Sequence, residues 1–224
     1  MGINKKRIAE RQRQAEKAAK KEQNTKNAAI ISIVVAIVAS LAVLGIGIGL
    51  AVDHIASAPK DYIAEIQIEE YGTITLELDG DAAPITVENF VKLAKEGFYD
   101  GLTFHRIIDG FMMQGGCPKG NGTGDAGYEI TGEFSSNGWD NPIKHERGVI
   151  SMARGNEPDS ASCQFFIVHE TSEHLDGKYA AFGRVTSGIE IVDDICGSAE
   201  PTDDNGTIAK NAQPVIKTIT VREK

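Results

Sequence analysis

The sequence is most distinctive between residues 104 and 116, which are Phe104-His105-Arg106-Ile107-Ile108-Asp109-Gly110-Phe111-Met112-Met113-Gln114-Gly115-Gly116. This segment places a single arginine among large apolar side chains and beside glycine turns. A cationic donor at the wall of an apolar pocket is typical of a binding site. The same pattern also arises when the aromatic residues belong to the core and Arg106 is a surface charge. The segment by itself leaves both interpretations open.

Three further segments share this mixture of large apolar residues, glycines and single polar residues: 148–154, 162–167 and 174–183. The candidates for one apolar pocket are Phe111, Met112, Phe166, Leu175 and Phe182. Burial in the core is the preferred interpretation for Met113, Phe165, Ile167 and Phe182. Phe182 therefore has two competing interpretations, and the core is the favoured one.

Hydrophobic periodicity outside these segments predicts a mainly β domain. Side chains alternate along residues 62–68 and 73–78, with a turn at Tyr71-Gly72 between them, which indicates a hairpin. Further strands are predicted at 149–153, 164–168, 180–185 and 215–221. Many short strands with few helices suggest a β-sandwich or a β-barrel.

Two helices are predicted in this domain. Pro84 begins the first, because proline suits the first turn of a helix. Its apolar residues share one face, and they are Val87, Phe90, Val91 and Ala94. Gly97 is the expected C-cap of this helix. The second, shorter helix is predicted around residues 189–195.

The four distinctive segments together resemble the cyclophilins, a family of peptidyl-prolyl cis-trans isomerases (EC 5.2.1.8). The pair Glu133-Phe134 and residues 176–182 are similar to bacterial members, and the resemblance covers residues 62–223. It implies an eight-stranded antiparallel barrel closed at each end by a helix, here a domain over residues 61–224. It also implies rotation about X-Pro bonds, which breaks no covalent bond, so neither a metal nor another cofactor is expected.

The resemblance also assigns roles to individual residues. Arg106 corresponds to the catalytic arginine, and Gln114 to a side chain that hydrogen-bonds the substrate backbone. The remaining substrate-binding positions that the resemblance implies are His105, Phe111, Met112, Ala153, Arg154, Gln164, Phe166, His174, Leu175 and Tyr179. Among them, the walls of a proline pocket correspond to Phe111, Met112, Phe166 and Leu175, and the floor of a neighbouring subsite to Ala153 and Gln164. His105 has a secondary role.

Three of these positions depart from common members of the family. Arg154 replaces an asparagine whose backbone contacts the peptide. His174 stands where many relatives have a tryptophan that contacts cyclosporin, and Tyr179 replaces a histidine that is common in eukaryotic members. The loop 155–162 also differs in length. The resemblance therefore does not carry over drug sensitivity or substrate preference beside the pocket.

The N-terminal part of the chain has a different composition. Residues 1–27 hold nine Lys and Arg against three Glu, and residues 28–52 form an uncharged, apolar run of 25 residues. As a helix this run is about 37 Å long, which exceeds the ~30 Å core of a bilayer. We therefore expect a transmembrane helix at 28–52, preceded by a basic tail and followed by a short tether at 53–60.

The charge asymmetry predicts the orientation in the membrane. Basic residues before the run and acidic residues after it place the N-terminus in the cytoplasm and the domain outside. The basic tail either lies on anionic lipid or is solvated. In an alternative interpretation the apolar run is a signal peptide that is cleaved after Ala58, because Ala56-Ser57-Ala58 fits a cleavage site. Under both interpretations the domain is exported: the transmembrane helix anchors it in the cell membrane, and the cleaved signal peptide leaves it secreted.

Composition argues against several other classes of protein. The net charge of the chain is −9, and residues 53–224 carry −15, so nucleic acid is not an expected partner. The glycines of 122–127 match a dinucleotide-binding pattern, but no helix is predicted to follow them. His169 and His174 are five residues apart, which is wrong for a zinc helix, and residues 203–206 form a turn cluster that lacks the rest of a calcium loop. Three cysteines do not form a disulfide framework.

We therefore expect a monomeric prolyl isomerase that assists the folding of exported proteins next to the cytoplasmic membrane. Its expected partners are proline-containing peptides, unfolded exported proteins and the membrane itself. The alternative from another class is a proline-peptide-binding module without catalysis. Retention of Arg106 weighs against that alternative, because binding alone does not require the arginine.

Overall fold

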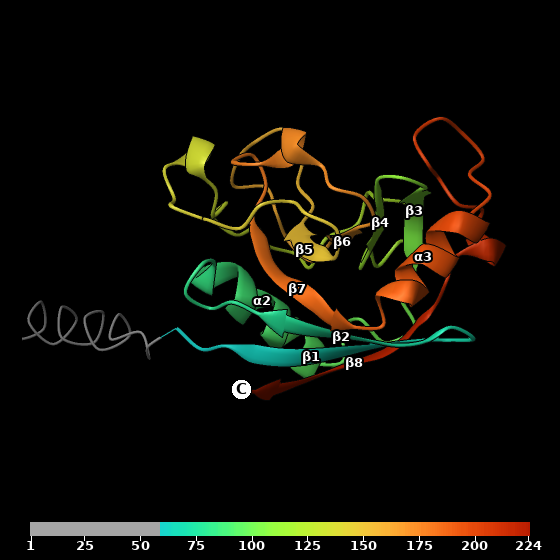
Figure 1. The fold of residues 1–224 in the computed structure, drawn as a ribbon, viewed down its shortest axis with the longest axis horizontal. Coiled ribbons are helices and arrows are strands. Elements are labelled where there is room, and N and C mark those ends of the chain that lie inside the picture. The colour runs from blue at the N-terminus through green and yellow to red at the C-terminus, as the bar shows by residue number, and fades with distance from the viewer. Residues whose placement is uncertain (1–58) are drawn as a thin grey trace, which may run out of the picture. The chain divides into compact units, whose positions relative to one another are not determined.

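The computed structural model describes residues 59–224, and Figure 1 shows how they are arranged. The strands are β1 (Tyr62–Ile68), β2 (Gly72–Leu78), β3 (Phe104–Ile108), β4 (Met112–Gly115), β5 (Val149–Met152), β6 (Phe165–Val168), β7 (Ala181–Ser187) and β8 (Ile216–Glu223). The helices are α2 (Pro84–Lys95) and α3 (Ile189–Ser198), and three 3₁₀ turns are η1 (Ser135–Asn137), η2 (Glu173–Leu175) and η3 (Lys210–Ala212). The predicted strands and both predicted helices are confirmed.

All eight strands belong to one antiparallel sheet in the order β3-β4-β6-β5-β7-β2-β1-β8. The sheet is curled, so that its two end strands, β3 and β8, approach each other. Thr103 forms a single bridge with Val215, and the N–H of Ile216 donates to the carbonyl of Leu102 at 2.7 Å. This short set of bonds, and not a full strand ladder, joins the two ends of the curled sheet.

The two helices lie on opposite sides of the domain in the view of Figure 1. Helix α2 packs against β8, and α3 packs against β2 and β4. The buried face of α2 includes the four apolar residues that the sequence pattern placed on one side, Val87, Phe90, Val91 and Ala94. Hydrophobic periodicity therefore predicted correctly which face of α2 covers the sheet.

Helix α2 ends in a Schellman motif. The N–H of Gly97 donates to the carbonyl of Ala94 at 3.0 Å, and the N–H of Phe98 donates to that of Leu93 at 3.0 Å. Gly97 has a φ of 69°, a left-handed conformation that glycine adopts without a steric penalty. The predicted role of Gly97 at the end of the helix is confirmed.

The beginning of α2 depends on a residue that is distant in sequence. Ala83 precedes the helix and has no side chain that can cap it. The carboxylate of Glu133 instead accepts the N–H of Ile85 at 2.9 Å and that of Thr86 at 2.8 Å. Glu133 is fully buried, and this burial raises the pKa of its carboxyl group. A buried carboxylate therefore takes the place of a local N-cap.

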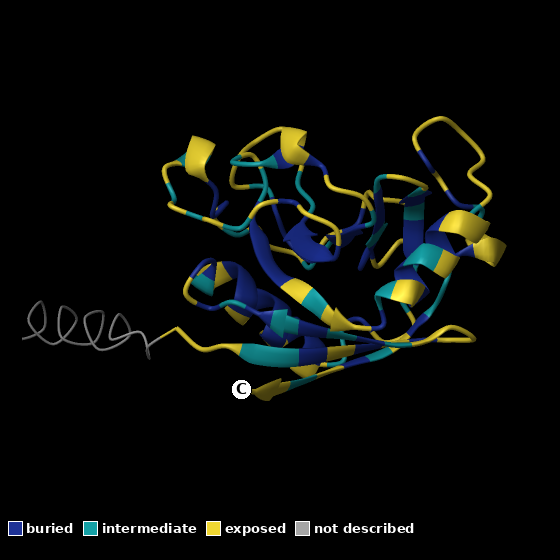
Figure 2. Ribbon diagram, in the orientation of Figure 1, coloured by how far each residue is buried: buried dark blue, intermediate teal, exposed yellow. Residues whose placement is uncertain are grey.

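The inner core lies within the curl of the sheet; β5 and β6 are buried along their whole length, while β1, β2 and β8 alternate between buried and more exposed residues, as the mixed colours of the strands in Figure 2 show. Its aromatic centre is Phe90 of α2. The ring centroid of Phe90 lies 5.3 Å from that of Tyr99, 5.4 Å from that of Phe165 and 5.3 Å from that of Phe182. All four rings are fully buried. Aromatic pairs at these separations stabilise a core beyond the area that they bury.

The predicted basic tail at 1–27, the predicted transmembrane helix at 28–52 and most of the predicted tether at 53–60 lie outside the described residues. From residue 59 onward, the structure contains no helix with the length and apolar character that crossing a bilayer requires. The predictions about the N-terminal part therefore stay predictions.

The cap of α2 leads to a test of stability. We expect Glu133→Ala to lower the free energy of unfolding by about 2 kcal/mol, because two buried N–H groups lose a charged acceptor. Glu133→Gln keeps one acceptor oxygen and should lose less. Urea denaturation followed by circular dichroism measures the change. The exposed Glu129→Ala is the matched control, with a change within about 0.5 kcal/mol, and equal stability of the two alanine variants would contradict the proposed cap.

Candidate active site

The two-residue period of β4 and β6 separates two apolar layers. Met113, Phe165 and Ile167 point into the inner core, and with Phe182 they are fully buried, as the sequence analysis preferred. Met112 and Phe166, their neighbours in sequence, lie on the opposite face of the sheet. There they form a second apolar cluster, which we name the pocket cluster: Met112, Val149, Phe166, Val168, Leu175 and Ala181.

A cavity of about 170 Å³ opens over the pocket cluster. Its lining consists of Arg106, Phe111, Met112, Gln114, Ala153, Arg154, Phe166, Leu175 and Tyr179. All of these residues are among the positions that the family resemblance implied. The volume is below the ~300 Å³ at which pockets for drug-sized ligands begin, so it suits one small apolar group. The lining residues come from all four of the distinctive sequence segments, 104–116, 148–154, 162–167 and 174–183, which the fold brings to one site.

Arg106, one of the two arginines that line this cavity, lies on β3 and directly opposite Gln114 of β4. Its Nη1 lies 3.4 Å from Oε1 of Gln114 and 3.7 Å from the sulfur of Met112. The guanidinium carbon lies 5.9 Å from the ring centroid of Phe111. Partial burial lowers the pKa of Arg106, and Tyr179 and Asp203 act in the opposite direction. An arginine stays charged under such a shift.

Gln114 connects this cavity to a second one. Its Nε2 donates to Oε1 of Gln164 at 3.0 Å. Nε2 of Gln164 in turn donates to the carbonyls of Gly122 and Gly124 at 3.0 Å and 2.8 Å. The second cavity, of about 290 Å³, shares Gln114, Ala153 and Arg154 with the first and is also lined by Gln164. Ala153 and Gln164, to which the resemblance assigned the floor of a neighbouring subsite, both line this second cavity.

Arg154 forms the boundary between the two cavities. Its guanidinium carbon lies 4.7 Å from the ring centroid of Tyr179 and 5.2 Å from that of Phe134. Its Nε donates to the carbonyl of Lys178 at 2.9 Å, and its Nη1 to that of Gly155 at 2.8 Å. Stacking and hydrogen bonds together hold the arginine in place. The departure from the usual asparagine therefore adds a charged wall to the site.

The remaining two implied residues lie outside the lining of both cavities. His174 is exposed in η2, and its ring centroid lies 5.4 Å from that of Phe111, so it supports the pocket wall from the rim. His105 is a buried residue of β3, next to Arg106 in sequence, and neither of its ring nitrogens has a hydrogen-bond partner within the described residues. Burial, reinforced by the charge of Arg106, lowers the pKa of His105 to about 4.

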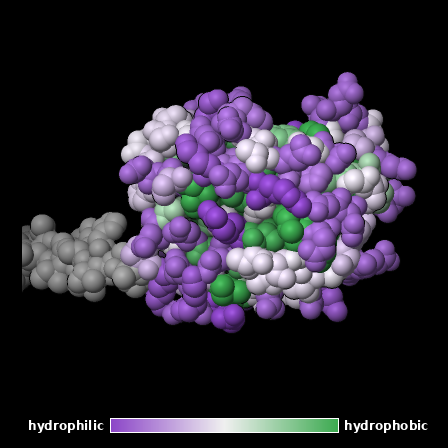
Figure 3. Space-filling model, viewed as in Figure 1, coloured by the Kyte–Doolittle hydropathy of each residue, from purple (hydrophilic) through white to green (hydrophobic). Residues whose placement is uncertain are grey.

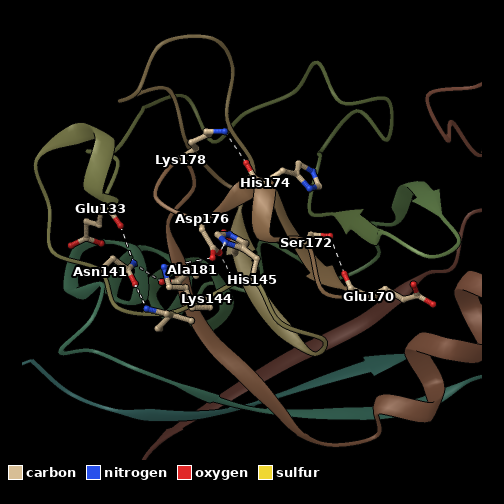
Figure 4. Close-up of polar contacts among 12 residues, drawn as sticks. Glu133, Asn141, Lys144, His145, Glu170, Ser172, His174, Asp176, Lys178 and Ala181 are labelled. Carbon is tan, nitrogen blue, oxygen red and sulfur yellow. Dashed lines mark hydrogen bonds and ion pairs between the residues drawn. The ribbon is translucent and has the colours of Figure 1, made fainter.

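A buried polar chain behind the pocket was not predicted from the sequence. Oδ1 of Asp176 lies 3.1 Å from Nδ1 of His145, and Nε2 of His145 lies 3.0 Å from Oγ of Ser151; Figure 4 shows His145 beside Asp176. Burial lowers the pKa of His145, which favours the neutral imidazole over the charged one; in the neutral form, Nδ1–H would donate to the Asp176 carboxylate and Nε2 would accept from the Ser151 hydroxyl. Its ring stacks on Phe166 with centroids 6.0 Å apart.

This chain of Asp, His and Ser does not offer a nucleophile, because the side chain of Ser151 is fully buried. It instead links the segment that carries Leu175 to strand β5 behind the floor of the pocket. The sequence contained no signal for it, since the three residues come from separate segments. Only the fold brings them together.

The cysteine thiols are also possible reactive groups. All three are buried, and burial raises the pKa of Cys163 to about 11 and that of Cys196 to about 12. Neither of these two thiols is activated as a nucleophile. Within residues 59–224, no group of three His, Cys, Asp or Glu side chains is placed to hold a metal ion.

The low pKa of His105 leads to a prediction about acid stability. Between pH 4 and about 6.5 the unfolded chain binds a proton at this histidine and the folded chain does not, so stability falls as the pH falls through this window. We expect His105→Leu to lessen the loss of unfolding free energy between pH 7 and pH 4 by about 1–3 kcal/mol. Urea denaturation at several pH values measures it. The exposed His174→Leu is the control, and identical pH profiles for wild type and His105→Leu would contradict the prediction.

Comparisons with known proteins agree with this geometry. The family model described as cyclophilin type peptidyl-prolyl cis-trans isomerase/CLD matches residues 63–221. Peptidyl-prolyl cis-trans isomerase B of Bacillus subtilis is 54% identical over 124 residues, which are 55% of this chain and 83% of that protein. A peptidyl-prolyl cis-trans isomerase of Helicobacter pylori is 50% identical over 126 residues, which are 55% of this chain and 74% of that protein.

A solved structure supports the same assignment. The crystal structure of a cyclophilin-type isomerase of Cryptosporidium parvum, determined in the presence of the dipeptide Ala-Pro, is similar with a TM-score of 0.63 and 28% identity. The match covers 72% of this chain and 99% of that chain. Sequence motifs, curled sheet and family match agree, and the chain belongs to the cyclophilin-type peptidyl-prolyl cis-trans isomerases (EC 5.2.1.8), which act on proline-containing peptides.

Proposed function

We propose that Arg106 is the catalytic residue of this isomerase and that the cavity over the pocket cluster holds the prolyl ring. The observation that carries the proposal is the position of the guanidinium at the wall of a small apolar cavity, with its Nη1 beside Gln114 and Met112. Rotation about an X-Pro bond requires that the amide loses resonance, at a barrier of ~18–20 kcal/mol. A residue that favours the twisted amide lowers this barrier.

Arg106 favours the twisted state by donating to the prolyl nitrogen. In the planar amide the lone pair of this nitrogen is delocalised, and in the twisted amide it becomes localised and available as an acceptor. A donor aimed at this nitrogen therefore stabilises the transition state more than the ground state. Arginine suits this task because it stays charged and holds its donors in a fixed plane.

The arginine alone does not supply the whole effect. An acceleration from tens of seconds to milliseconds is about 10⁴-fold and corresponds to ~5.5 kcal/mol. One charge-assisted hydrogen bond contributes ~1.5–3 kcal/mol. The remainder comes from the cavity, in which Phe111, Met112, Phe166 and Leu175 hold the ring and exclude water. Gln114 orients the peptide backbone beside it.

We further propose that this activity serves the folding of exported proteins at the outer face of the cytoplasmic membrane. The support comes from the sequence: a basic segment at 1–27, an apolar run at 28–52 and a strongly acidic domain after it. On the face shown in Figure 3 the described residues are mostly hydrophilic, with a few apolar patches near the centre. A hydrophilic domain on a short tether is suited to meet unfolded chains as they leave the membrane.

The role of Arg106 is tested by the cis-to-trans rate of an Ala-Pro peptide. We expect Arg106→Ala to lower kcat/KM about 10²–10³-fold, by analogy with the loss of an oxyanion donor. Arg106→Lys keeps the charge but loses the planar donors, and should recover only part of the activity. Arg184→Ala, which removes an exposed arginine of β7, is the matched control and should be as active as wild type. Full activity of a folded Arg106→Ala protein would overturn the assignment. If the wild-type protein binds the peptide but does not accelerate its isomerisation, the result would favour a binding module.

The membrane anchor is tested by fractionation of cells that express the full chain. We expect the protein in the membrane fraction, released by detergent but not by high salt, because an apolar helix and not surface charge holds it. A variant without residues 28–52 should lose membrane association. Intact mass separates the two forms, since cleavage after Ala58 leaves a protein that begins at Pro59. Full-length protein in the soluble fraction would contradict the anchor.

A further inference from the structure

The loop that follows α3 lies against the strand that carries Arg106. Figure 1 shows this loop beyond the end of α3 and next to β3. Arg106 and Thr207 form an antiparallel bridge. The N–H of Ile107 donates to the carbonyl of Gly206 at 2.8 Å, and the N–H of Ile208 donates to that of His105 at 3.0 Å. The loop therefore extends the sheet at its β3 edge, directly beside the site.

One backbone carbonyl of this loop binds the side chain of Arg106. Nε of Arg106 donates to the carbonyl of Asn205 at 2.7 Å, which is the shortest of the hydrogen bonds that this guanidinium makes. Nη1 is directed to Gln114 and Met112 on the other side. Among the residues from 59 onward, Nη2 has no hydrogen-bond partner. The guanidinium is therefore held from two sides, and one of its donor groups stays available to a substrate.

The position of the Asn205 carbonyl depends on the side chain of Asp203. Oδ1 of Asp203 accepts the N–H of Asn205 at 3.0 Å and that of Thr207 at 3.0 Å. The N–H of Gly206 donates to the backbone carbonyl of Asp203 at 3.1 Å. These bonds engage the N–H groups on one side of the turn, which leaves the carbonyl of Asn205 to face Arg106. The bonds from these N–H groups also lower the pKa of Asp203.

Gly206 shows how closely the loop approaches β3. Its φ is +82°, in the left-handed region, and a Cβ atom there would lie 2.4 Å from Cγ1 of Ile108 and 2.7 Å from the carbonyl oxygen of Ile107. No other residue fits without a shift of the strand. The loop therefore has a defined position relative to Arg106, and a small movement of the turn moves the acceptor of Nε.

We propose that Asp203 is a positioning residue of the isomerase, which shapes the turn 203–207 so that the Asn205 carbonyl orients the guanidinium of Arg106. The proposal rests on the proposed catalytic role of Arg106. Asp203 acts through the backbone and does not touch the substrate. The cluster at residues 203–206, which the sequence suggested to be only a turn, therefore contributes to the geometry of the site.

The test is a double-mutant cycle between Asp203 and Arg106 in the full-length protein. Misplacement of a catalytic group by about 1 Å can cost as much as ~10²-fold in rate, so we expect Asp203→Ala to lower kcat about 10-fold with little change in KM. Asp203→Asn should retain most of the activity, because an asparagine oxygen accepts the same N–H groups. Asp204→Ala is the matched control: Asp204 is exposed and makes no side-chain hydrogen bond in the described part of the chain, so its removal should leave kcat unchanged.

The cycle separates positioning from general damage to the fold. If Asp203 acts through Arg106, Asp203→Ala has no further effect in the Arg106→Ala background. An equal loss in both backgrounds, or full activity of Asp203→Ala, would overturn the proposal and leave the role of Arg106 intact. Full activity of Arg106→Ala would instead overturn the proposed catalytic role itself.

A spectroscopic measurement checks the contact directly and does not depend on activity. The Nε–H of Arg106, observed by NMR in 15N-labelled protein, should exchange slowly with solvent in wild type, because it is bonded to Asn205. We expect faster exchange in Asp203→Ala and wild-type exchange in Asp204→Ala. If Asp203→Ala does not fold, Asp203→Ser is used for both measurements, since serine keeps a shorter acceptor. Unchanged exchange in folded Asp203→Ala, or in Asp203→Ser where Asp203→Ala does not fold, would also overturn the proposal.

Discussion

The alternation of side chains along β4 and β6 is the constraint on which the site depends. In a strand, neighbouring residues point to opposite faces, so one short segment serves two apolar layers at once. Met113 and Phe165 fill the inner core, while Met112 and Phe166 form the floor of the pocket. A shift of register by one residue would exchange the two sets and remove both the core and the site. The same alternating pattern along β4 and β6 therefore determines both the packing of the core and the floor of the pocket.

Polar contacts between residues distant in sequence fix the helix and the loops, whose positions are not determined by the alternation of side chains along the strands. Glu133 caps α2 from 48 residues along the chain, and the pair Gln114–Gln164 ties β4 to the loop that lines the second cavity. His145 links Asp176 to Ser151 behind Phe166. Each of these groups is at least partly withdrawn from water, where an unpaired polar group is costly. The pocket is thereby enclosed by contacts that tolerate little rearrangement.

The electrostatics of the site differ from those of the domain as a whole. Residues 53–224 carry a net charge of −15, yet the described cavity places Arg106 and Arg154 at its wall. Both guanidinium groups lie near aromatic rings and bind backbone carbonyls, Asn205 for Arg106 and Lys178 for Arg154. Carbonyl acceptors fix the orientation of an arginine without neutralising its charge. A donor so oriented is what stabilisation of a localised lone pair requires.

The sequence by itself determined the class of fold, six of the eight strands, both helices and most of the residues that line the pocket, whereas β3 and β4 were not predicted as individual strands. These features follow from local patterns, namely hydrophobic periodicity, turn glycines and distinctive motifs. Such patterns involve residues that are close in sequence, so they can be read without the tertiary structure. Three features were decided only by the tertiary structure: the Glu133 cap, the buried chain through His145 and the contact between the turn at Asp203 and Arg106. Each of these features includes at least one contact between residues that are 31 or more positions apart in the chain, and only the folded domain brings such residues together. Their geometry depends on packing across the whole domain, and no local pattern encodes it.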